Sequence, residues 1–495
     1  MQNYTKTESF MNKSKQVQTS GELFEAVQLT PCFKDSKHFV DMTPKYDSKD
    51  ILIKYHNSKN SKDFDILEFV EENFIPPFGE KFYQPKDNAS LKSYIEQMWS
   101  FLSQQTDIKD KDNSLIALPK PYIIPGCRFR EVYYWDTYFT CEGLRISNDI
   151  EMIKNVADNF KYLIETVGFI PNANRTYYLT RSQPPLFYLI VNILHQEFGI
   201  NAIKDYLPVL EIEYNFWMNT ARNVNGLNRY WDEDNTPRPE SYIEDIEHAN
   251  SIENKNNFYR NVRAACESGW DFSSRWFAKD DDFNTLQTTD ILPIDLNSYL
   301  YGFENLISKW FKEIGNEAKA TNFANLASIR KNKIQTQFWN DNKNFFCDIN
   351  HISNTHTHIL SLAGTTPLFL NIATPEQAHK VAKIIEKDFL TEYGLVTTLH
   401  NTSQQWDSPN GWAPLHWQTV IGLRNYGFDE LAKTIATRFV KTVGAKFNEI
   451  SKIREKYDVC DPNSKATGGE YIVQDGFGWT NGVVLAFMDM YNLYL

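Results

Sequence analysis

The chain has 495 residues, of which 42% are hydrophobic, 23% charged and 15% aromatic, and its 51 Lys and Arg against 63 Asp and Glu give a formal net charge of −12. A chain of this length and composition can bury a large core, which excludes global disorder. The acidic balance and the scattered basic residues exclude the basic face that nucleic acids and anionic membrane surfaces require.

The chain begins with a polar stretch that is rich in Ser, Thr, Asn, Gln and Lys. We expect residues 1–20 to form a flexible segment, because such a composition buries too little apolar surface to order itself. The rest of the chain has no Pro/Ser-rich tract, long charge block or low-complexity run that would mark a linker. We therefore expect one domain over residues 21–495.

Helical periodicity recurs along this body. Apolar residues at a spacing of three and four follow Asp149, a residue type that caps helix N-termini. The run 374–376, Thr-Pro-Glu, has the order of an N-cap, a first-turn proline and a first-turn acid. A similar apolar pattern follows Asp429, whereas strand-like alternation with Asn-Gly or Asp-Gly turns is scarce. The sequence therefore predicts a mostly α fold.

The cysteines and the apolar segments bear on the compartment. The 6 Cys lie far apart without a CxxC pair, which favours free thiols in a reducing compartment. The N-terminus lacks the apolar stretch of a signal peptide. The most apolar run, 186–194, is interrupted by Asn192 and is too short to cross a bilayer. These observations predict a cytoplasmic protein.

Long segments rich in Trp, Tyr, Arg, Asp, Gly and Pro lie between the predicted helices. Loops of this length in a compact domain are usually functional. A sugar needs this mixture, because its hydroxyls take bonds from guanidinium and carboxylate groups while its C–H face lies on an aromatic ring. The same residues would also suit structural loops pinned by Arg–carboxylate pairs. The segments are 121–140, 171–185, 229–242, 266–276, 404–417 and 453–482.

The sequence has no motif for a metal or a phosphate group. It lacks the HExxH pattern of catalytic zinc sites, and the run 468–470, Gly-Gly-Glu, is too short for a phosphate-binding loop. The acidic run 280–282 lacks the spaced ligands of a calcium loop. We therefore expect no cofactor and no metal. Hydrolysis of a glycosidic bond would need two carboxyl groups, which spacing alone does not select among 63 acidic residues.

Two long motifs in these segments are specific enough to compare with a known family. Residues 125–138 read PGCRFREVYYWDTY, and residues 405–414 read QWDSPNGWAP. They resemble the signatures PGGRFxExYxWDxY and QWDxPxGWxP of the α,α-trehalases of glycoside hydrolase family 37, and similarity covers nearly everything after residue 21. The resemblance implies an all-α, (α/α)6 toroid with long active-site loops. It also implies an inverting glycoside hydrolase that converts α,α-trehalose to α- and β-D-glucose without a cofactor.

The resemblance also assigns residues to roles. The general acid of the family falls on Asp271 and the general base on Glu455. Trp406 and Asp407 of the second motif are expected to line the same pocket. The glucose-binding positions fall on Arg128, Trp135, Asp136, Asn172, Arg181, Ser182, Gln183, Arg238, Glu240, Gly269 and Glu470.

These roles carry physical expectations. The two carboxyl groups of an inverting pair stand roughly 6.5–9.5 Å apart, which leaves room for the attacking water. We expect an apolar wall to keep Asp271 protonated, and Arg454 and Lys456 to keep Glu455 ionised. Two departures from the family pattern, Cys127 in place of a glycine and a glycine run of only two residues before the acid at 470, put the closure of the loop over the sugar in doubt.

Other functions remain open at this point. One alternative is another inverting α-glucosidase or a disaccharide phosphorylase on the same fold, and another is a non-catalytic trehalose-binding protein. In each case the partner is a small-molecule substrate rather than a nucleic acid or a membrane. We expect the chain to be a monomer.

Overall fold

The structure, a computed structural model, describes residues 16–493 except 31, 78–88, 107–111, 280, 462, 465 and 467. Its α-helices are α2 (Glu22–Leu29), α3 (Lys37–Val40), α4 (Ser48–Ser58), α5 (Ile66–Asn73), α6 (Leu91–Leu102), α7 (Tyr134–Ile146), α8 (Ile150–Val167), α9 (Phe187–Phe198), α10 (Leu207–Trp217), α11 (Tyr242–His248), α12 (Lys255–Glu267), α13 (Ile294–Glu313), α14 (Glu317–Gln337), α15 (Thr366–Phe369), α16 (Pro375–Ile384), α17 (Ala413–Asn425), α18 (Asp429–Ile450) and α19 (Gly478–Tyr491).

The strands are short and pair antiparallel. β12 and β13 join the second sequence motif to the segment that follows Glu455, with Trp412 opposite Lys456. The strands are β1 (Thr43–Pro44), β2 (Phe74–Ile75), β3 (Ser103–Gln104), β4 (Tyr122–Ile123), β5 (Asn223–Val224), β6 (Leu227–Asn228), β7 (Ile291–Leu292), β8 (Trp339–Asn340), β9 (Phe345–Phe346), β10 (Ile349–Asn350), β11 (Thr355–His356), β12 (Asn410–Trp412) and β13 (Lys456–Asp458).

Two predicted helix starts are confirmed with their caps. The Asp149 carboxylate accepts a hydrogen bond of 3.1 Å from the Met152 N–H, so it satisfies one of the free donors at the start of α8. Thr374 and Gln377 form a reciprocal capping box at the start of α16. The pattern after residue 428 begins α18, whose first helical residue is Asp429.

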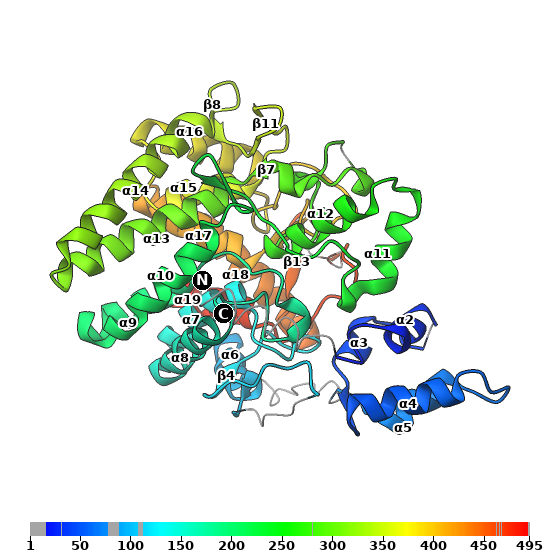
Figure 1. Cartoon of the computed structure of the whole chain (residues 1–495). Coiled ribbons are helices and arrows are strands. Elements are labelled where there is room, and N and C mark those ends of the chain that lie inside the picture. The colour runs from blue at the N-terminus through cyan, green and yellow to red at the C-terminus, as the bar shows by residue number, and fades with distance from the viewer. Residues whose placement is uncertain are drawn as a thin grey trace.

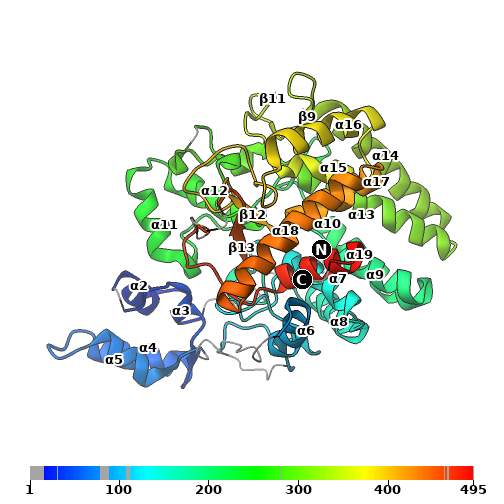
Figure 2. The same ribbon diagram turned by 180° about the vertical axis from the view of Figure 1, so that it is seen from behind.

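Among the described residues, six helices form a closed ring. α7 contacts α9, α9 contacts α13, and the series continues through α15 and α17 to α19, which packs against α7 again. Other helices pack against the outside of this ring: α8 against α7 and α9, α14 against α13, and α18 against α17 and α19. Figures 1 and 2 show the red helix α19 beside the cyan helix α7, and α13 and α14 as an adjacent pair.

Burial separates the inner from the outer helices. Every residue of α7 from Tyr134 to Leu144 is buried, as expected for a helix enclosed on all sides. In α8 the buried residues lie mainly on one face, which is the pattern of a helix with one side in solvent. This inner ring with outer helices is an (α/α)6 toroid, so the predicted all-α fold class is confirmed.

The N-terminal arm, residues 16–75, carries α2 to α5 and lies beside the ring (Figure 1). Residues 16–19 are buried, so the packed chain begins before residue 21; residues 1–15 of the predicted flexible segment lie outside the described residues. Lys37 of the arm lies 2.8 Å from the Glu131 carboxylate, and Asp41 lies 3.4 Å from Arg175. These buried ion pairs fix the arm against the first motif and the segment 171–185.

Among the described residues, no helix is both long enough and apolar enough to cross a bilayer.

Candidate active site

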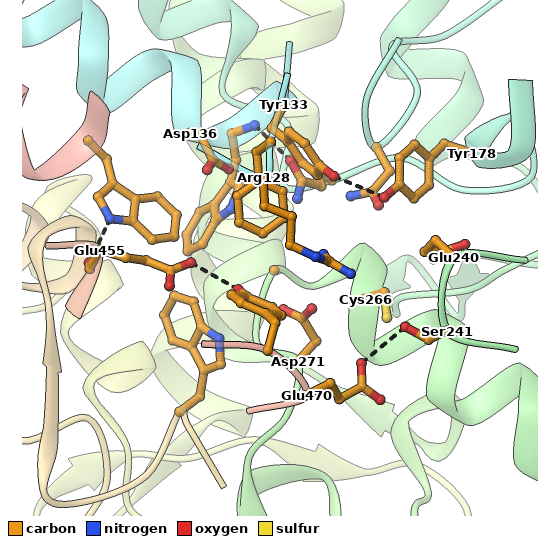
Figure 3. Close-up of a pocket in the computed structure, with 18 of the residues that line it drawn as sticks. Arg128, Tyr133, Asp136, Tyr178, Glu240, Ser241, Cys266, Asp271, Glu455 and Glu470 are labelled. Atoms are coloured by element: carbon orange, nitrogen blue, oxygen red, sulfur yellow. Dashed lines mark hydrogen bonds between the residues drawn. The ribbon is translucent and has the colours of Figure 1, made fainter. Parts of the chain in front are cut away.

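Most of the site residues predicted from the sequence line one pocket (Figure 3). It encloses about 660 Å³ of space free of protein atoms, open solvent included. The inner helices α7, α17 and α19 begin beside it, because Trp135, Trp412 and Trp479 all line its wall. The predicted site residues that line it are Arg128, Trp135, Asp136, Asn172, Arg181, Gln183, Arg238, Glu240, Gly269, Asp271, Trp406, Glu455 and Glu470.

Asp271 lies shortly after the end of α12 and faces this pocket. Gly269 positions its segment: a Cβ at this residue would lie 2.7 Å from the Trp135 ring, and its φ of +75° is one that glycine tolerates. Burial raises the pKa of the Asp271 carboxyl to about 7, and the nearby negative charges of Glu470 and Glu455 add to the shift. Asp271 is therefore suited to hold a proton near neutral pH.

Glu455 precedes β13 and faces the same pocket. The hydroxyl of Tyr471 donates a hydrogen bond of 2.9 Å to Oε1, whereas the buried Oε2 has no hydrogen-bond partner among the described residues. Burial raises the pKa of the Glu455 carboxyl, and Lys456, Tyr471 and Arg128 oppose that rise. Arg238 and a backbone hydrogen bond oppose the rise at Asp271 too, but there the negative charges of Glu470 and Glu455 add to it.

Three arginines of the pocket are held by carboxylates. Arg128 makes two bonds to Asp35 of the N-terminal arm, of 2.5 and 2.7 Å. Arg181 donates to Glu240 at 2.6 Å. Such paired contacts fix the plane of a guanidinium group and leave its other N–H groups to a ligand.

Arg238 is the third of these arginines, and it lies between two carboxylates. It bonds Asp245 at 2.6 Å and Glu470 at 2.7 Å. The Ser241 hydroxyl donates to Glu470 as well, at 3.3 Å. Glu470, on the segment before α19, is thereby tied to the opposite side of the pocket.

Aromatic rings form the remaining wall. Trp406 and Trp412 are stacked with their ring centroids 3.9 Å apart and an interplanar angle of 1°. Trp135 and Trp479 meet Trp406 at 5.8 and 6.2 Å. Flat faces of this kind, together with the charged forks opposite, suit a ligand with C–H faces and many hydroxyls.

Two predicted site residues do not line the pocket. The Ser182 hydroxyl donates to the Ile170 carbonyl at 2.6 Å, and its backbone N–H donates to Glu267. Asp407 is fully buried and accepts hydrogen bonds from four donors, on Ser273, Ser274, Thr398 and Thr402. Both residues hold the backbone of pocket segments in place.

Asp407→Ala should therefore lower stability more than it changes sugar binding. Four donors would lose their acceptor in the interior, and we expect the free energy of unfolding to fall by about 3 kcal/mol. Guanidinium denaturation followed by tryptophan fluorescence measures this, with Asp407→Asn as the control that keeps the shape and one acceptor oxygen. Unchanged stability with a raised KM would instead place Asp407 in contact with the substrate.

Several pocket residues escaped the sequence analysis, among them Tyr471 and Cys266. Tyr471 follows Glu470, and Cys266 is the first residue of the segment 266–276, so their place in these segments was the only signal in the sequence. Cys266 accepts from Arg238 at 3.4 Å, and burial raises the pKa of its thiol to about 12. The lining residues without a predicted role are Phe129, Tyr133, Tyr178, Ser241, Cys266, Trp412, Tyr471, Phe477 and Trp479.

Cys127, the departure from the first motif, adopts a φ of +46°, in the left-handed region that favours glycine. Its thiol donates to the Asp475 carbonyl at 3.2 Å and it does not line the pocket. The substitution therefore affects the backbone of the motif rather than the surface that a ligand would meet.

The described residues contain no cluster of three or more His, Cys, Asp or Glu side chains able to hold a metal ion.

The fold is a helical toroid whose inner helices begin at a pocket, and that pocket holds two buried carboxyl groups, fixed arginines and tryptophans. This combination is typical of a glycoside hydrolase. The family model described as Trehalase matches residues 31–492. The chain belongs to the trehalase family.

Individual relatives agree with this assignment. The periplasmic trehalase of Citrobacter koseri is 42% identical over 488 residues, which cover 95% of this chain and 85% of that protein. A periplasmic trehalase of Escherichia coli is also 42% identical, over 95% of this chain and 86% of its own length. The resemblance to the trehalases is confirmed.

Solved structures support the fold. The neutral trehalase of Saccharomyces cerevisiae superposes with a TM-score of 0.67 at 25% identity, over 82% of this chain and 80% of that one. A mannosylglycerate hydrolase of family GH63 from Thermus thermophilus, in complex with glucose, gives a TM-score of 0.58 at 14% identity, over 81% of this chain and 100% of that one. The second similarity concerns the fold alone.

The predicted cytoplasmic location is wrong in the light of these relatives, which are named as periplasmic enzymes. The prediction relied in part on widely spaced cysteines, and none of the six forms a disulfide in the structure. Disulfides are needed mainly by small domains that lack a sufficient core, whereas a chain of this size is held together by its core in either compartment. The absence of disulfides from these six cysteines therefore does not indicate the compartment of this protein.

Proposed function

We propose that this chain hydrolyses α,α-trehalose to one α-glucose and one β-glucose, with Asp271 as the general acid and Glu455 as the general base. The observation that carries the proposal is the contrast between these two carboxyl groups in one pocket. Burial and neighbouring acids raise the pKa of Asp271 to about 7, whereas Lys456, Tyr471 and Arg128 oppose the rise in the pKa of Glu455. Such a contrast supports Asp271 as the acid and Glu455 as the base.

The proposed reaction is a single displacement. Glu455 takes a proton from a water molecule as the water oxygen attacks C1 of one glucose unit from the face opposite the glycosidic oxygen. The bond between C1 and that oxygen breaks, and Asp271 donates its proton to the leaving oxygen. The attacked unit leaves as β-glucose and the other as α-glucose, and proton exchange with solvent restores both carboxyl groups.

The unpartnered Oε2 of Glu455 suits this role. A buried carboxylate oxygen without a hydrogen bond from any described residue is a site that a water molecule can occupy as donor. Tyr471 holds the other oxygen, Oε1, and so limits rotation of the carboxylate. The arrangement supports a base that is aimed before the substrate arrives.

The remaining pocket residues would bind the two glucose units. Arg128 and Arg181 are each fixed by a carboxylate, so their remaining N–H groups would meet sugar hydroxyls without a further loss of side-chain entropy. The N–H groups of Arg238 already bond Asp245, Glu470 and Cys266, so this arginine holds the other pocket groups in place. The lining residues Asp136, Asn172, Gln183, Glu240 and Glu470 supply further hydrogen-bond groups, and Trp135 and Trp406 supply ring faces. All of these residues belong to one chain, which supports activity as a monomer.

A proton NMR time course with trehalose tests the proposal. We expect α- and β-glucose to appear in equal amounts at first, before mutarotation, and without a requirement for phosphate. Release of glucose 1-phosphate only when phosphate is present would indicate a phosphorylase. Equal rates on maltose would indicate a broader α-glucosidase, and less than one glucose per protein molecule would indicate a binding protein.

The pH dependence of kcat/KM should be bell-shaped, because the reaction needs Asp271 protonated and Glu455 ionised. Activity is lost as pH rises through about 7, where Asp271 gives up its proton. Glu470→Gln removes the largest of the nearby negative charges that raise the pKa of Asp271, so this variant should lose activity at a lower pH on the alkaline side. If the alkaline limb of the kcat/KM profile is unchanged in Glu470→Gln, a group other than Asp271 determines the pH of that limb.

A further inference from the structure

A buried lysine lies directly behind the pocket. Lys456 is the first residue of β13 and is only 1% exposed. Its ammonium group donates to Gln405 Oε1 at 2.8 Å and to the Gly468 carbonyl at 2.9 Å. The same group lies 5.3 Å from the centre of the Trp412 ring, which lines the pocket. This position is outside the sugar-lining surface but immediately next to it.

The partners of this lysine belong to the segments that carry the reactive groups. The Gln405 side chain donates to the backbone carbonyl of Asp271. Gly468 lies two residues before Glu470, and a Cβ at Gly469 would lie 2.6 Å from Gln405 Oε1, so this loop packs directly on the glutamine. Lys456 is the residue next to Glu455. Its ammonium group is therefore linked through Gln405 to the segment of Asp271 and directly to the loop of Glu470.

The charge of Lys456 differs from that of the pocket arginines. Arg128, Arg181 and Arg238 all form ion pairs with buried or partly buried carboxylates. Lys456 forms no ion pair with a carboxylate of the described residues, and both of its hydrogen-bond acceptors are neutral. Its positive charge is therefore not cancelled locally and acts on the carboxyl groups in front of it.

We propose that Lys456 and Gln405 are positioning residues for hydrolysis: their bridge holds the segments of Asp271, Glu455 and Glu470 in register, and Lys456 supplies an uncancelled positive charge behind Glu455. The inference rests on the proposed roles of Asp271 and Glu455. Neither Lys456 nor Gln405 lines the pocket, so both act through the groups that they hold.

Several charged or titratable groups act on the pKa of the Glu455 carboxyl. Burial raises the pKa of Glu455, and Lys456 is the largest influence against that rise. Burial in turn lowers the pKa of Lys456 to about 8, while Glu455 and Asp271 favour its charged form. The charged or titratable groups that act on Glu455 are Lys456, Tyr471, Arg128, Asp136 and Asp271.

Lys456→Met tests the charge, because methionine fills a similar space without an ammonium group. The acid limb of the kcat/KM profile, assigned to Glu455, should move to higher pH by about one unit. Lys446→Met is the matched control, since Lys446 on α18 pairs at 2.7 Å with the exposed Glu449, and it should leave the limb in place. An acid limb that stays at its wild-type position in Lys456→Met overturns the electrostatic part.

Gln405→Met tests the bridge while it leaves the lysine charge present, and it serves also if Lys456→Met does not fold. We expect kcat to fall by about tenfold with KM changed by less than about threefold, because the carboxyl groups lose their alignment rather than the sugar its contacts. An unchanged kcat overturns the positioning part. A separate result bears on the proposed function: if Glu455→Ala retains turnover, Glu455 is not the general base. This result does not depend on the outcome at Lys456 and Gln405.

Discussion

Asp271→Asn should lower the turnover of trehalose by about 10²- to 10⁴-fold. Asparagine keeps the shape of the side chain but cannot give a proton to the glycosidic oxygen, which would then have to leave as an alkoxide. The loss should appear mainly in kcat, because the arginines and tryptophans that would bind the sugar are unchanged. Initial rates of glucose release measure it, and circular dichroism checks that the variant is folded.

A substrate that needs no acid distinguishes this role from a general loss of structure. Fluoride leaves carbon without protonation, so Asp271→Asn should hydrolyse α-D-glucopyranosyl fluoride at a rate within about tenfold of the wild type. Equal losses on trehalose and on the fluoride would remove Asp271 from the role of acid. Asp407→Asn is a useful comparison, since it alters a buried carboxylate that does not line the pocket.

The sequence predicted helices that have local capping signals better than the inner helices of the ring. Asp149 and the run 374–376 have local capping chemistry, and the structure confirms both helix starts. Helix α7 is buried around its whole circumference and contains polar and aromatic residues on every side. It therefore has no amphipathic pattern to detect, and its place in the ring depends on contacts with α19 and α9, which are distant in sequence.

The candidate site shows the same limit at the level of single residues. A polar residue in a loop motif either faces the ligand or holds the backbone, and Glu240 and Asp407 are alike in sequence although only Glu240 lines the pocket. Arg454 and Lys456 both flank Glu455, yet Arg454 lies 3.9 Å from Asp475 while Lys456 influences the pKa of Glu455. These differences arise only when distant segments meet.

The raised pKa of Asp271 is a further property that no local pattern contains. It depends on burial and on the charge of Glu470, about 200 residues further along the chain, which Arg238 and Ser241 hold in place. The family resemblance therefore pointed to the residue, whereas its protonation state follows from the folded pocket. Residues such as Tyr471, which act on Glu455 through one hydrogen bond, are likewise visible only in three dimensions.

Glu455→Ala should abolish turnover of both trehalose and α-glucosyl fluoride, with losses of about 10²- to 10⁴-fold on each. Both substrates need a water molecule to be deprotonated as it attacks, so the identity of the leaving group does not help. This response is the opposite of that expected for Asp271→Asn. Parallel assays of the two variants on the two substrates therefore assign the acid and the base independently.

Azide can replace water as the nucleophile in Glu455→Ala and so tests whether Glu455 activates water. Azide attacks carbon without giving up a proton, and the smaller alanine side chain leaves space beside C1 where Glu455 Oε1 and Oε2 stood. With α-glucosyl fluoride, the C–F bond breaks as the C–N bond forms on the opposite face, so β-glucosyl azide and fluoride should appear at a rate that rises with azide concentration. The α-anomer of the azide would indicate a covalent glucosyl intermediate and a retaining reaction, because two displacements restore the configuration. No product in Glu455→Ala, with α-glucosyl fluoride still turned over by Asp271→Asn, would mean that Glu455 maintains the pocket rather than activating water.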